Sequence, residues 1–285
     1  MGELARPSVV VEILNRHGIR LSRSLGQHFL VDGNLLARIV ETAGISGEET
    51  VLEIGPGIGT LTEELCRRAR RVVSVEADRR LVPVLEEALG GRANLEIVEG
   101  DAVRVDLAGL FRPGERVVVV SNLPYNVATP LLLRLLRELP QAERMVVMVQ
   151  RELADRYTAV PGHPAYGGVS VKMRLLAEAR RVLSVPPTVF LPPPRVESAV
   201  LRVERRPTAV PEAEIDPFFL FLNACFSGRR KMLVNALGAG RVPYCPRARV
   251  EEALRACGLS PASRAEELGC EELLALFRAL APASR

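Results

Sequence analysis

The segment TVLEIGPGIGT, residues 50–60, decides the fold of this chain. It begins as an apolar strand, passes through glycines at every second position, and ends at Thr60, where a helical pattern begins. A strand, a glycine turn and a helix in this order are typical of the first unit of an α/β sheet that has helices on both faces. The segment therefore predicts an α/β domain with a binding site at the glycine turn.

The spacing of the glycines indicates what the turn holds. Thr60 stands where a dinucleotide-binding fingerprint has its third glycine, so the loop fits a pyrophosphate poorly. It fits better a small sulfonium cofactor that lies against the bare backbone of Gly55 and Gly57, with Glu53 orienting the loop or the cofactor. A purely structural turn between strand and helix is the alternative.

Acidic residues follow the next two predicted strands. The strand at residues 71–75 ends in Glu76, and the strand at residues 95–98 is followed by Asp101. A carboxylate at the end of the second strand can accept hydrogen bonds from both hydroxyls of a ribose, and we assign this role to Glu76. Asp101 is placed to accept from an adenine amino group. Each acid alone fits a solvated loop charge, but the ordered set of strand ends favours a nucleoside cofactor.

The fourth predicted strand, residues 116–120, runs into SNLPY, residues 121–125. The Asn122 side-chain oxygen and the Leu123 carbonyl can accept the two hydrogens of an exocyclic amine on a nucleobase, which frees the nitrogen lone pair for methylation. Pro124 fixes φ and removes a competing donor. Tyr125 can stack on a base that has been taken out of its helix. The alternative is a strand that ends in a proline turn with a tyrosine in the core.

A second aromatic residue, Phe190, is predicted to face Tyr125. It lies in residues 186–194, a segment with five prolines. A loop stiffened in this way can hold the ring against the second face of a flipped base. Packing of Phe190 in the core is the alternative, and its position alone favours that alternative.

The composition describes a folded chain without a membrane segment. Of the 285 residues, 48% are hydrophobic and 25% are charged, as in an ordinary folded chain. The length is sufficient for two domains. No apolar run approaches membrane-spanning length and the N-terminus does not resemble a secretory signal, so we expect a cytoplasmic protein. The five cysteines are irregularly spaced and include no CxxC pair, which argues against a metal site and against a disulfide framework.

The order of the patterns predicts the domain organisation. Strands alternate with helices up to residue 205, which implies a mostly parallel, doubly wound sheet, and residues 196–203 alternate as an antiparallel strand does. Residues 1–205, with a basic N-terminal extension, are predicted to form this domain. Residues 206–217, which contain three prolines, are predicted to be a linker, and residues 218–285 a small helical domain.

The charge distribution permits nucleic acid as a partner. The net charge is +4, and all but two of the 38 basic residues are arginine, which suits phosphate geometry, although codon bias explains this preference equally well. Residues 227–249 contain no acid and include Arg229, Arg230 and Lys231. This run suits an RNA backbone, and a solvated surface is the alternative.

Several motifs that follow one another along nearly the whole chain carry a family resemblance: LGQHFL (25–30), EIGPGIGTLTEEL (53–65), VEAD (75–78), EGDA (99–102), SNLPYN (121–126), YGG (166–168) and VFLPPPRVESAV (189–200). With them in this order, the chain resembles the ribosomal RNA adenine N6-dimethyltransferase family, most closely its small-subunit branch. FSGRRKMLVNAL, residues 226–237, is similar to the signature that follows the catalytic domain in that branch.

The resemblance implies a Rossmann-like class I methyltransferase domain followed by a helical domain that binds RNA or the ribosome. It implies the transfer of methyl groups from S-adenosylmethionine to the N6 atoms of two adjacent adenosines near the 3′ end of small-subunit rRNA, two methyls on each. The expected partners are the small ribosomal subunit and its rRNA, with no membrane and no metal, and we expect a monomer. The implied cofactor contacts are His28, Leu30, Gly55, Gly57, Glu76, Asp101 and Asn122.

Two other functions share these features. A large-subunit rRNA adenine methyltransferase of the macrolide-resistance type has the same catalytic domain, but residues 226–237 argue against it. A non-catalytic RNA-binding assembly factor on this fold would be expected to have lost cofactor motifs, and none is lost here. The motif at residues 25–30 often has Asn where this chain has His28, and both side chains can donate and accept hydrogen bonds.

Overall fold

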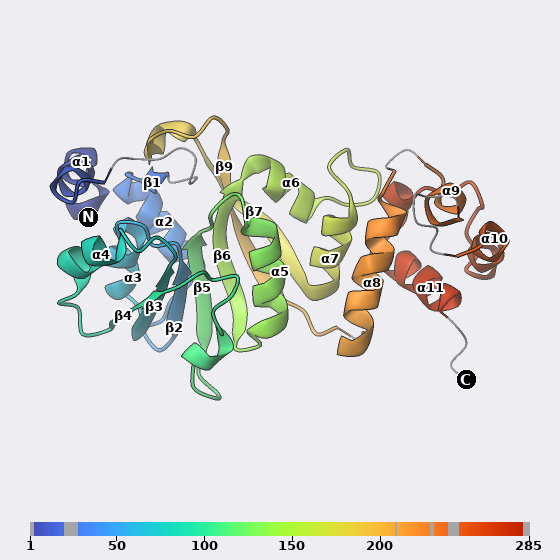
Figure 1. Cartoon of the computed structure of the whole chain (residues 1–285), viewed down its shortest axis with the longest axis horizontal. Helices are drawn as coiled ribbons and strands as arrows, with labels where there is room; N and C mark the ends of the chain where they lie inside the picture. Colours follow the sequence, from blue (N-terminus) through green and yellow to red (C-terminus); the bar gives the residue numbers. More distant parts are fainter. Residues whose placement is uncertain (1–2, 20–27, 209, 229–230, 239–244, 282–285) are drawn as a thin grey trace. The chain divides into compact units, whose positions relative to one another are not determined.

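The computed structural model describes residues 3–19, 28–208, 210–228, 231–238 and 245–281. The chain divides into two compact units. The first consists of Met1–Ala154 and Glu178–Arg205 and contains most of the sheet, and the second consists of Asp155–Ala177 and Arg206–Arg285 and is mainly helical. Figure 1 shows the sheet with helices on both of its faces.

In the described part of the chain, seven strands form one sheet in the order β4-β3-β2-β5-β6-β9-β7. Neighbouring strands from β4 to β6 are parallel, whereas β9 is antiparallel to β6. This confirms the predicted mostly parallel sheet with an antiparallel strand. The strand bounds are β2 Thr50–Ile54, β3 Arg71–Glu76, β4 Leu95–Glu99, β5 Val117–Asn122, β6 Ala142–Gln150, β7 Ala177–Val185 and β9 Ser198–Arg205.

The central strands are apolar because both of their faces are covered. Side chains alternate along a strand, so Val118 and Val120 of β5 point to one face and Val119 to the other, and all three are buried. On the first face they belong to a core cluster with Ile39 and Leu65, which come from helices α2 and α3. Covering of both faces is what the uninterrupted valine run of β5 predicts.

The helices of the first unit connect these strands. Helix α2 is capped by Asp32, whose Oδ1 accepts a hydrogen bond of 2.9 Å from the backbone N–H of Leu35. Helix α4 follows β3 directly and was not among the predicted elements. The helix bounds are α1 Pro7–Arg16, α2 Gly33–Ala43, α3 Thr60–Cys66, α4 Val82–Leu89, α5 Ala128–Glu138 and α6 Arg151–Thr158, the last of which crosses the boundary between the units.

Helix α1 packs beside the glycine turn. Val10 and Leu14 form a core cluster with Ile58 of the turn and with Val84 of α4. The carboxylate of Glu87, also on α4, accepts a hydrogen bond of 2.6 Å from Arg16. The N-terminal helix therefore supports the glycine turn from outside the sheet.

A second, two-stranded sheet joins distant parts of the sequence. Strand β1, Phe29–Leu30, pairs antiparallel with β8, Phe190–Leu191, and the backbone N–H of Val31 donates to Val189 O at 2.8 Å. The pairing brings two motifs about 160 residues apart into direct contact, which the sequence patterns did not predict.

The second unit has an aromatic core. The rings of Phe218 and Phe221 lie 5.5 Å and 5.7 Å from the ring of Phe277, and the hydroxyl of the buried Tyr166 donates to Leu268 O at 2.8 Å. The helices of this unit are α7 Gly168–Leu176, α8 Glu212–Cys225, α9 Leu233–Gly238, α10 Arg247–Ala256 and α11 Cys270–Leu280.

The boundaries of the units differ from the predicted ones. Helix α8 begins at Glu212, inside the predicted linker, and residues 155–177 belong to the helical unit because Tyr166 packs within it. A proline-rich composition suggested a linker, but Pro211 directly precedes the helix and Pro217 lies inside it. In the described ranges, no helix is long and apolar enough to cross a membrane.

Candidate active site

A cavity of about 660 Å³ lies in the first unit, at the carboxyl ends of the parallel strands. It is the edge at which doubly wound sheets bind their ligands. Side chains and backbone from five strand ends meet there, and those that matter below are His28, Leu30, Glu53, Gly55, Gly57, Glu76, Asp101, Asn122, Leu123, Pro124 and Tyr125.

The glycine turn brings bare backbone to the cavity. Gly55, Gly57 and Gly59 have φ angles of +69°, +64° and +88°, a region that other residues rarely occupy. At Gly57 a Cβ atom would lie 2.7 Å from Cε1 of Phe29, so there is no room for a side chain. The turn is therefore closed by β1 on one side and open to the cavity on the other.

Glu76 connects the end of β3 to the glycine turn. Its two carboxylate oxygens accept hydrogen bonds from the backbone N–H of Gly57 at 3.0 Å and of Asp78 at 2.8 Å. Burial raises the pKa of Glu76, although these two hydrogen bonds act in the opposite direction. Each oxygen keeps a further lone pair, so the carboxylate can still accept from the two hydroxyls of a ribose.

Asp101 lies on the rim of the cavity after the end of β4. Its Oδ1 accepts a hydrogen bond of 2.9 Å from the backbone N–H of Val103. The loop is fixed from outside by Arg134 of α5, whose guanidinium donates to Ala102 O at 2.6 Å and to Val105 O at 2.9 Å. The sequence patterns gave no signal for Arg134, because its partners are backbone carbonyls of a loop about 30 residues away.

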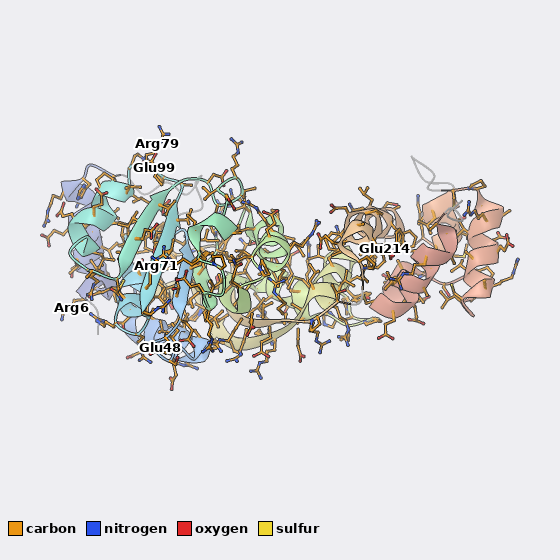
Figure 2. The ribbon with its side chains drawn as sticks, turned by 90° about the horizontal axis from the view of Figure 1, so that it is seen from below. Arg6, Glu48, Arg71, Arg79, Glu99 and Glu214 are labelled. Atoms are coloured by element: carbon orange, nitrogen blue, oxygen red, sulfur yellow. The ribbon has the colours of Figure 1, made fainter. Side chains whose placement is uncertain are left out.

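Charged residues of the same rim pair with one another. Arg79, after β3, forms an ion pair of 2.8 Å with Glu99 at the end of β4. Both side chains are labelled in Figure 2. The Arg79 side chain is 85% exposed, so this contact contributes little to stability.

Glu53 is buried on β2 behind the glycine turn and lines the cavity. One of its oxygens, Oε2, accepts from the hydroxyls of Thr62 at 2.6 Å and Ser74 at 2.9 Å. Burial raises the pKa of Glu53 to about 7, and the charge of Glu76 acts in the same direction. A carboxyl group that titrates near neutral pH in a cavity is typical of a functional site.

Asn122 ends β5 with an acceptor that has no donor. Its Nδ2 donates to His28 O at 3.3 Å, whereas its Oδ1 is buried and receives no hydrogen bond from any residue that the structure describes. An unsatisfied buried acceptor costs about 1–3 kcal/mol, which indicates a group reserved for a ligand.

Leu123 follows Asn122 at the cavity. Its backbone N–H donates to Met148 O at 3.1 Å, so the main chain is anchored to β6 at this point. Within the described ranges, no hydrogen bond to the Leu123 carbonyl is observed. Two acceptor groups, the Asn122 amide and the Leu123 carbonyl, thus stand one residue apart without donors.

Tyr125 is fixed by two contacts. Its hydroxyl and that of Ser198, at the start of β9, are 2.6 Å apart, and its ring stacks on the imidazole of His28 with 5.9 Å between centroids. His28 is fixed in turn by a contact of 2.8 Å between its Nδ1 and Pro192 O. Ser198 was not predicted as a site residue, since only the folded sheet brings it to Tyr125.

Comparisons with known proteins identify the family of this chain. Residues 18–281 match the family model described as ribosomal RNA adenine dimethylase. The ribosomal RNA small subunit methyltransferase A of Geobacillus thermodenitrificans is 42% identical over 99% of both chains. The chain belongs to the ribosomal RNA adenine dimethylase family.

Two solved structures have a fold similar to that of this chain. A dimethyladenosine transferase from Plasmodium falciparum superposes with a TM-score of 0.73 at 26% identity, covering 87% of this chain and 96% of that one. The 23S rRNA methyltransferase ErmE superposes with a TM-score of 0.65 at 32% identity, covering 88% and 99%. The Rossmann-like methyltransferase fold predicted from the motifs is confirmed.

As a member of the dimethylase family, the protein is an rRNA adenine methyltransferase that uses S-adenosylmethionine. The residues of the cavity fit this cofactor: the glycine turn offers backbone without side chains, and the Glu76 carboxylate keeps lone pairs for a ribose. When bound, S-adenosylmethionine supplies an electrophilic methyl group. The residue roles within the cavity, from His28 to Asn122, remain predictions.

The predicted base sandwich of Tyr125 and Phe190 is not formed in this structure. Phe190 is only 3% exposed and belongs to the core cluster that contains Val118 and Val120 of β5. Its backbone pairs with Leu30 in the two-stranded sheet, which directs its side chain into this core. The ring that stacks on Tyr125 is instead that of His28.

The predicted RNA-binding run is only partly described. Arg229 and Arg230 lie outside the described residues, and Lys231 is exposed just before α9, in the second unit. The backbone N–H of Lys231 donates to Gly228 O at 2.8 Å, so its main chain is held in a turn while its side chain faces solvent.

Proposed function

We propose that this protein dimethylates the N6 atoms of two adjacent adenosines near the 3′ end of small-subunit rRNA. The observation that carries the chemistry is the pair of acceptors without donors, Asn122 Oδ1 and the Leu123 carbonyl, at the end of β5. The relative that is 42% identical over 99% of both chains is a small subunit methyltransferase, which supports the choice of the small subunit.

The two acceptors act on the amine that is to be methylated. The lone pair of an adenine N6 amine is delocalised into the ring, which makes the nitrogen a weak nucleophile. Hydrogen bonds from its two N–H groups to Asn122 Oδ1 and Leu123 O draw the hydrogens out of the ring plane and localise the lone pair on nitrogen. The nitrogen then attacks the methyl group, a C–N bond forms as the C–S bond breaks, and the N–H proton leaves to solvent.

The surrounding residues hold the base and exclude competing contacts. Pro124 offers no N–H donor next to the amine. The ring of Tyr125, fixed by Ser198 and His28, presents a flat apolar surface on which a flipped adenine can stack. Positioning of this kind supplies most of the barrier reduction, since no strong base is needed.

Replacement of Asn122 tests the mechanism. Asn122→Ala is expected to lower the methyl-transfer rate by about 100-fold or more, the effect of removing one preorganised hydrogen-bonding group from an active site. The assay measures transfer of labelled methyl groups to small ribosomal subunits that lack the modification. Binding of the cofactor should stay measurable by calorimetry, although Asn122 is itself an implied cofactor contact; unchanged transfer in this variant would refute the amine clamp.

Mapping of the labelled nucleotides tests the substrate. Primer extension on both rRNAs of ribosomes treated with the protein should show stops at two adjacent adenosines of the small subunit alone. Stops in the large-subunit rRNA would favour the macrolide-resistance type of activity, which the similarity to ErmE keeps as the second candidate. A protein that binds no S-adenosylmethionine would be an assembly factor rather than an enzyme.

We also propose that the protein works as a monomer in the cytoplasm, where small ribosomal subunits are its partners. The helical unit, with Lys231 exposed in front of α9, is proposed to contact the ribosome, together with the basic residues next to it in the sequence. Lys231→Glu should weaken binding to small subunits without changing cofactor affinity, which sedimentation and calorimetry can measure. The mass of the free protein in sedimentation equilibrium tests the monomer.

A further inference from the structure

A second cavity lies at the opposite edge of the same sheet. It has a volume of about 1060 Å³ and is formed where β3 and β4 begin and by residues 109–115, the loop that precedes β5. Figure 2 shows Arg71, the first residue of β3, well apart from Arg79 and Glu99, which lie at the carboxyl ends of β3 and β4. Parallel strands place the cofactor cavity at their carboxyl ends, so this cleft is not part of the cofactor site.

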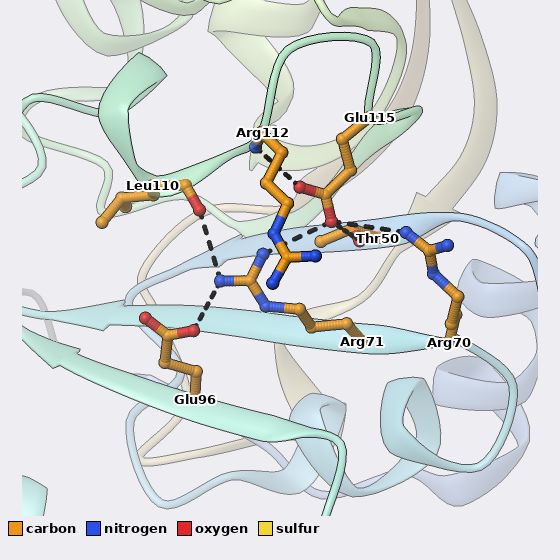
Figure 3. Close-up of polar contacts among 7 residues, drawn as sticks. All are labelled: Thr50, Arg70, Arg71, Glu96, Leu110, Arg112 and Glu115. Atoms are coloured by element: carbon orange, nitrogen blue, oxygen red, sulfur yellow. Dashed lines mark hydrogen bonds and ion pairs between the residues drawn. The ribbon is translucent and has the colours of Figure 1, made fainter.

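Glu115 organises the cleft (Figure 3). Its side chain is only 5% exposed and accepts hydrogen bonds from the Thr50 hydroxyl and from the backbone N–H of Arg112, the latter at 2.9 Å. It also pairs with Arg71 at 3.3 Å and with Arg70 at 3.6 Å. Burial alone would raise the pKa of Glu115, but these partners outweigh it and the pKa is lowered.

The three arginines in the cleft differ in how many partners they have. Arg71 has the most, since besides Glu115 it donates to Glu96 at 2.5 Å and to Leu110 O at 3.2 Å. Arg70 is 57% exposed and is held only by the long contact to Glu115. In the part of the chain that the structure describes, the guanidinium of Arg112 makes no hydrogen bond or ion pair.

The backbone around these arginines is fixed in advance. Asn94 donates to Cys66 O at 2.9 Å and to Ala69 O at 3.0 Å, which holds the turn immediately before Arg70. On the other side, Glu115 holds the turn that carries Arg112. Donors on a preorganised scaffold bind an anion with less loss of conformational entropy than donors on a mobile loop.

The cleft has more positive than negative charge. Three guanidinium groups, those of Arg70, Arg71 and Arg112, face two carboxylates, those of Glu96 and Glu115. The planar guanidinium fork matches two phosphate oxygens, and unpaired donors on two of the three forks leave a place for one phosphate group. Among the described lining residues the only aromatic one, Phe111, is buried, so the cleft offers no surface for stacking a base.

We propose that this cleft binds a backbone phosphate of the substrate RNA through Arg70 and Arg112, with Arg71 and Glu115 as the scaffold. The inference rests on the proposed function for the source of the phosphate. It adds an RNA contact on the side of the catalytic domain away from the methyl-transfer site. A contact to the backbone anchors the RNA without reading its sequence.

The test compares variants that remove arginines at the same edge of the sheet. Arg70→Ala/Arg112→Ala removes the two guanidiniums with the fewest partners, and Arg112→Ala alone disturbs no observed side-chain contact. The control, Arg116→Ala, removes an arginine that is 71% exposed, pairs with Glu49 at 3.6 Å and does not line the cleft. Thermal melting of each variant establishes that it is folded.

Affinity for unmodified small subunits is measured over a series of salt concentrations. The double variant should bind about tenfold more weakly than wild type, and its log–log salt slope should be shallower by about one for each phosphate that it no longer neutralises. Arg112→Glu should bind more weakly than Arg112→Ala, and Arg116→Ala should match wild type. Equal affinities and equal slopes for the double variant and Arg116→Ala would overturn the proposal.

Two further readouts separate this proposal from its neighbours. In methyl transfer, the double variant should raise KM for subunits while kcat and cofactor affinity stay within about twofold of wild type. Absence of transfer by wild type would refute the proposed function but not the cleft, which the salt series tests by binding alone. Binding of inorganic phosphate that depends on Arg112, with unchanged RNA affinity, would assign a site for free anions and overturn the RNA contact.

Discussion

At the carboxyl-end and amino-end edges of one sheet, the pKa values of buried acids are shifted in opposite directions. At the carboxyl-end edge, burial raises the pKa of Glu53 and Glu76 more than their hydrogen bonds lower it. At the amino-end edge, hydrogen bonds and neighbouring arginines outweigh burial, and the pKa values of Glu49 and Glu115 are lowered.

The difference separates the demands of binding from those of stability. At the edge proposed to bind the cofactor, carboxylates are buried away from water, and Asn122 Oδ1 has no donor in the described structure. Both features lower the stability of the protein without its ligand. At the amino-end edge the carboxylates have hydrogen-bond donors and arginine partners. The groups left without partners there are hydrogen-bond donors. Four experiments test this difference.

The largest effect is expected from filling the glycine turn. Gly57→Ala combines a positive φ, which costs about 1–2 kcal/mol, with a Cβ atom 2.7 Å from Phe29, a clash of about 1–3 kcal/mol. Because the turn can relieve both only by leaving the conformation against which the cofactor is proposed to lie, cofactor affinity should fall by up to roughly 10³-fold, measured by calorimetry. Gly114→Ala is the matched control, because Gly114 also has a positive φ, +77°, but a Cβ there meets no atom within 4 Å. Equal cofactor affinity in the two variants would contradict the role assigned to the turn.

The next effect concerns Glu53 and has a definite pH dependence. The folded protein holds the Glu53 proton up to a pKa of about 7, whereas the unfolded chain releases it near the ordinary glutamate pKa of 4.5. Stability therefore falls as the pH rises between these values and stays low above pH 7. Glu53→Gln should gain stability over wild type by roughly 3 kcal/mol at pH 8 and by almost nothing near pH 4.5.

Urea midpoints at several pH values measure this difference, and Glu115→Gln provides the opposite case. Because the folded pKa of Glu115 is lowered, its carboxylate stabilises the protein above the unfolded pKa, and that stability is lost as the pH falls through the folded value. Glu115→Gln should therefore be destabilised at pH 8, and the deficit should shrink in acid. Parallel behaviour of the two variants would remove the contrast between the edges.

A smaller effect is expected at Arg134, which holds the loop that carries Asp101. Arg134→Leu removes two hydrogen bonds to loop carbonyls and should raise KM for the cofactor about tenfold while kcat changes less than about twofold, since hydrogen bonds to a charged group contribute about 1.5–3 kcal/mol each. Glu138→Ala removes only the exposed partner of Arg134 and should leave both constants unchanged. A fall in kcat with constant KM would place Arg134 in the chemistry instead.

The smallest effect is expected at Ser198. Removing its hydrogen bond with the Tyr125 hydroxyl costs about 1 kcal/mol, so Ser198→Ala should lower kcat only a few-fold. Tyr125→Phe breaks the same hydrogen bond and should lower kcat equally. The double variant should be no worse than either single one, and additive effects would show that the two hydroxyls act separately.

Much of this architecture could be predicted because its signals are local. The apolar strands, the glycine turn after β2 and the acids at the strand ends each depend on neighbouring residues in the sequence. Their alternation with helices then predicted a mostly parallel sheet, in which successive parallel strands end at the same edge. Placing Glu76 at the cavity needed no long-range information.

The rest depends on contacts that no local pattern records. Phe190 was predicted to face a base because prolines surround it, but pairing with Leu30 decides the direction of its side chain. Ser198, Arg134 and the cleft around Glu115 are assembled from distant segments. The assignment of residues 155–177 to the helical unit likewise depends on where Tyr166 is buried.

The bridge made by Arg134 has a consequence for the order of binding. It ties the loop at residues 101–105 to α5, the helix that follows the residues proposed to hold the target amine. If binding of the methyl donor orders this loop and helix, less conformational entropy is lost when the RNA binds afterwards. Thermodynamic reciprocity then requires the RNA to tighten the donor by the same factor, so the ternary complex is equally stable whichever ligand arrives first.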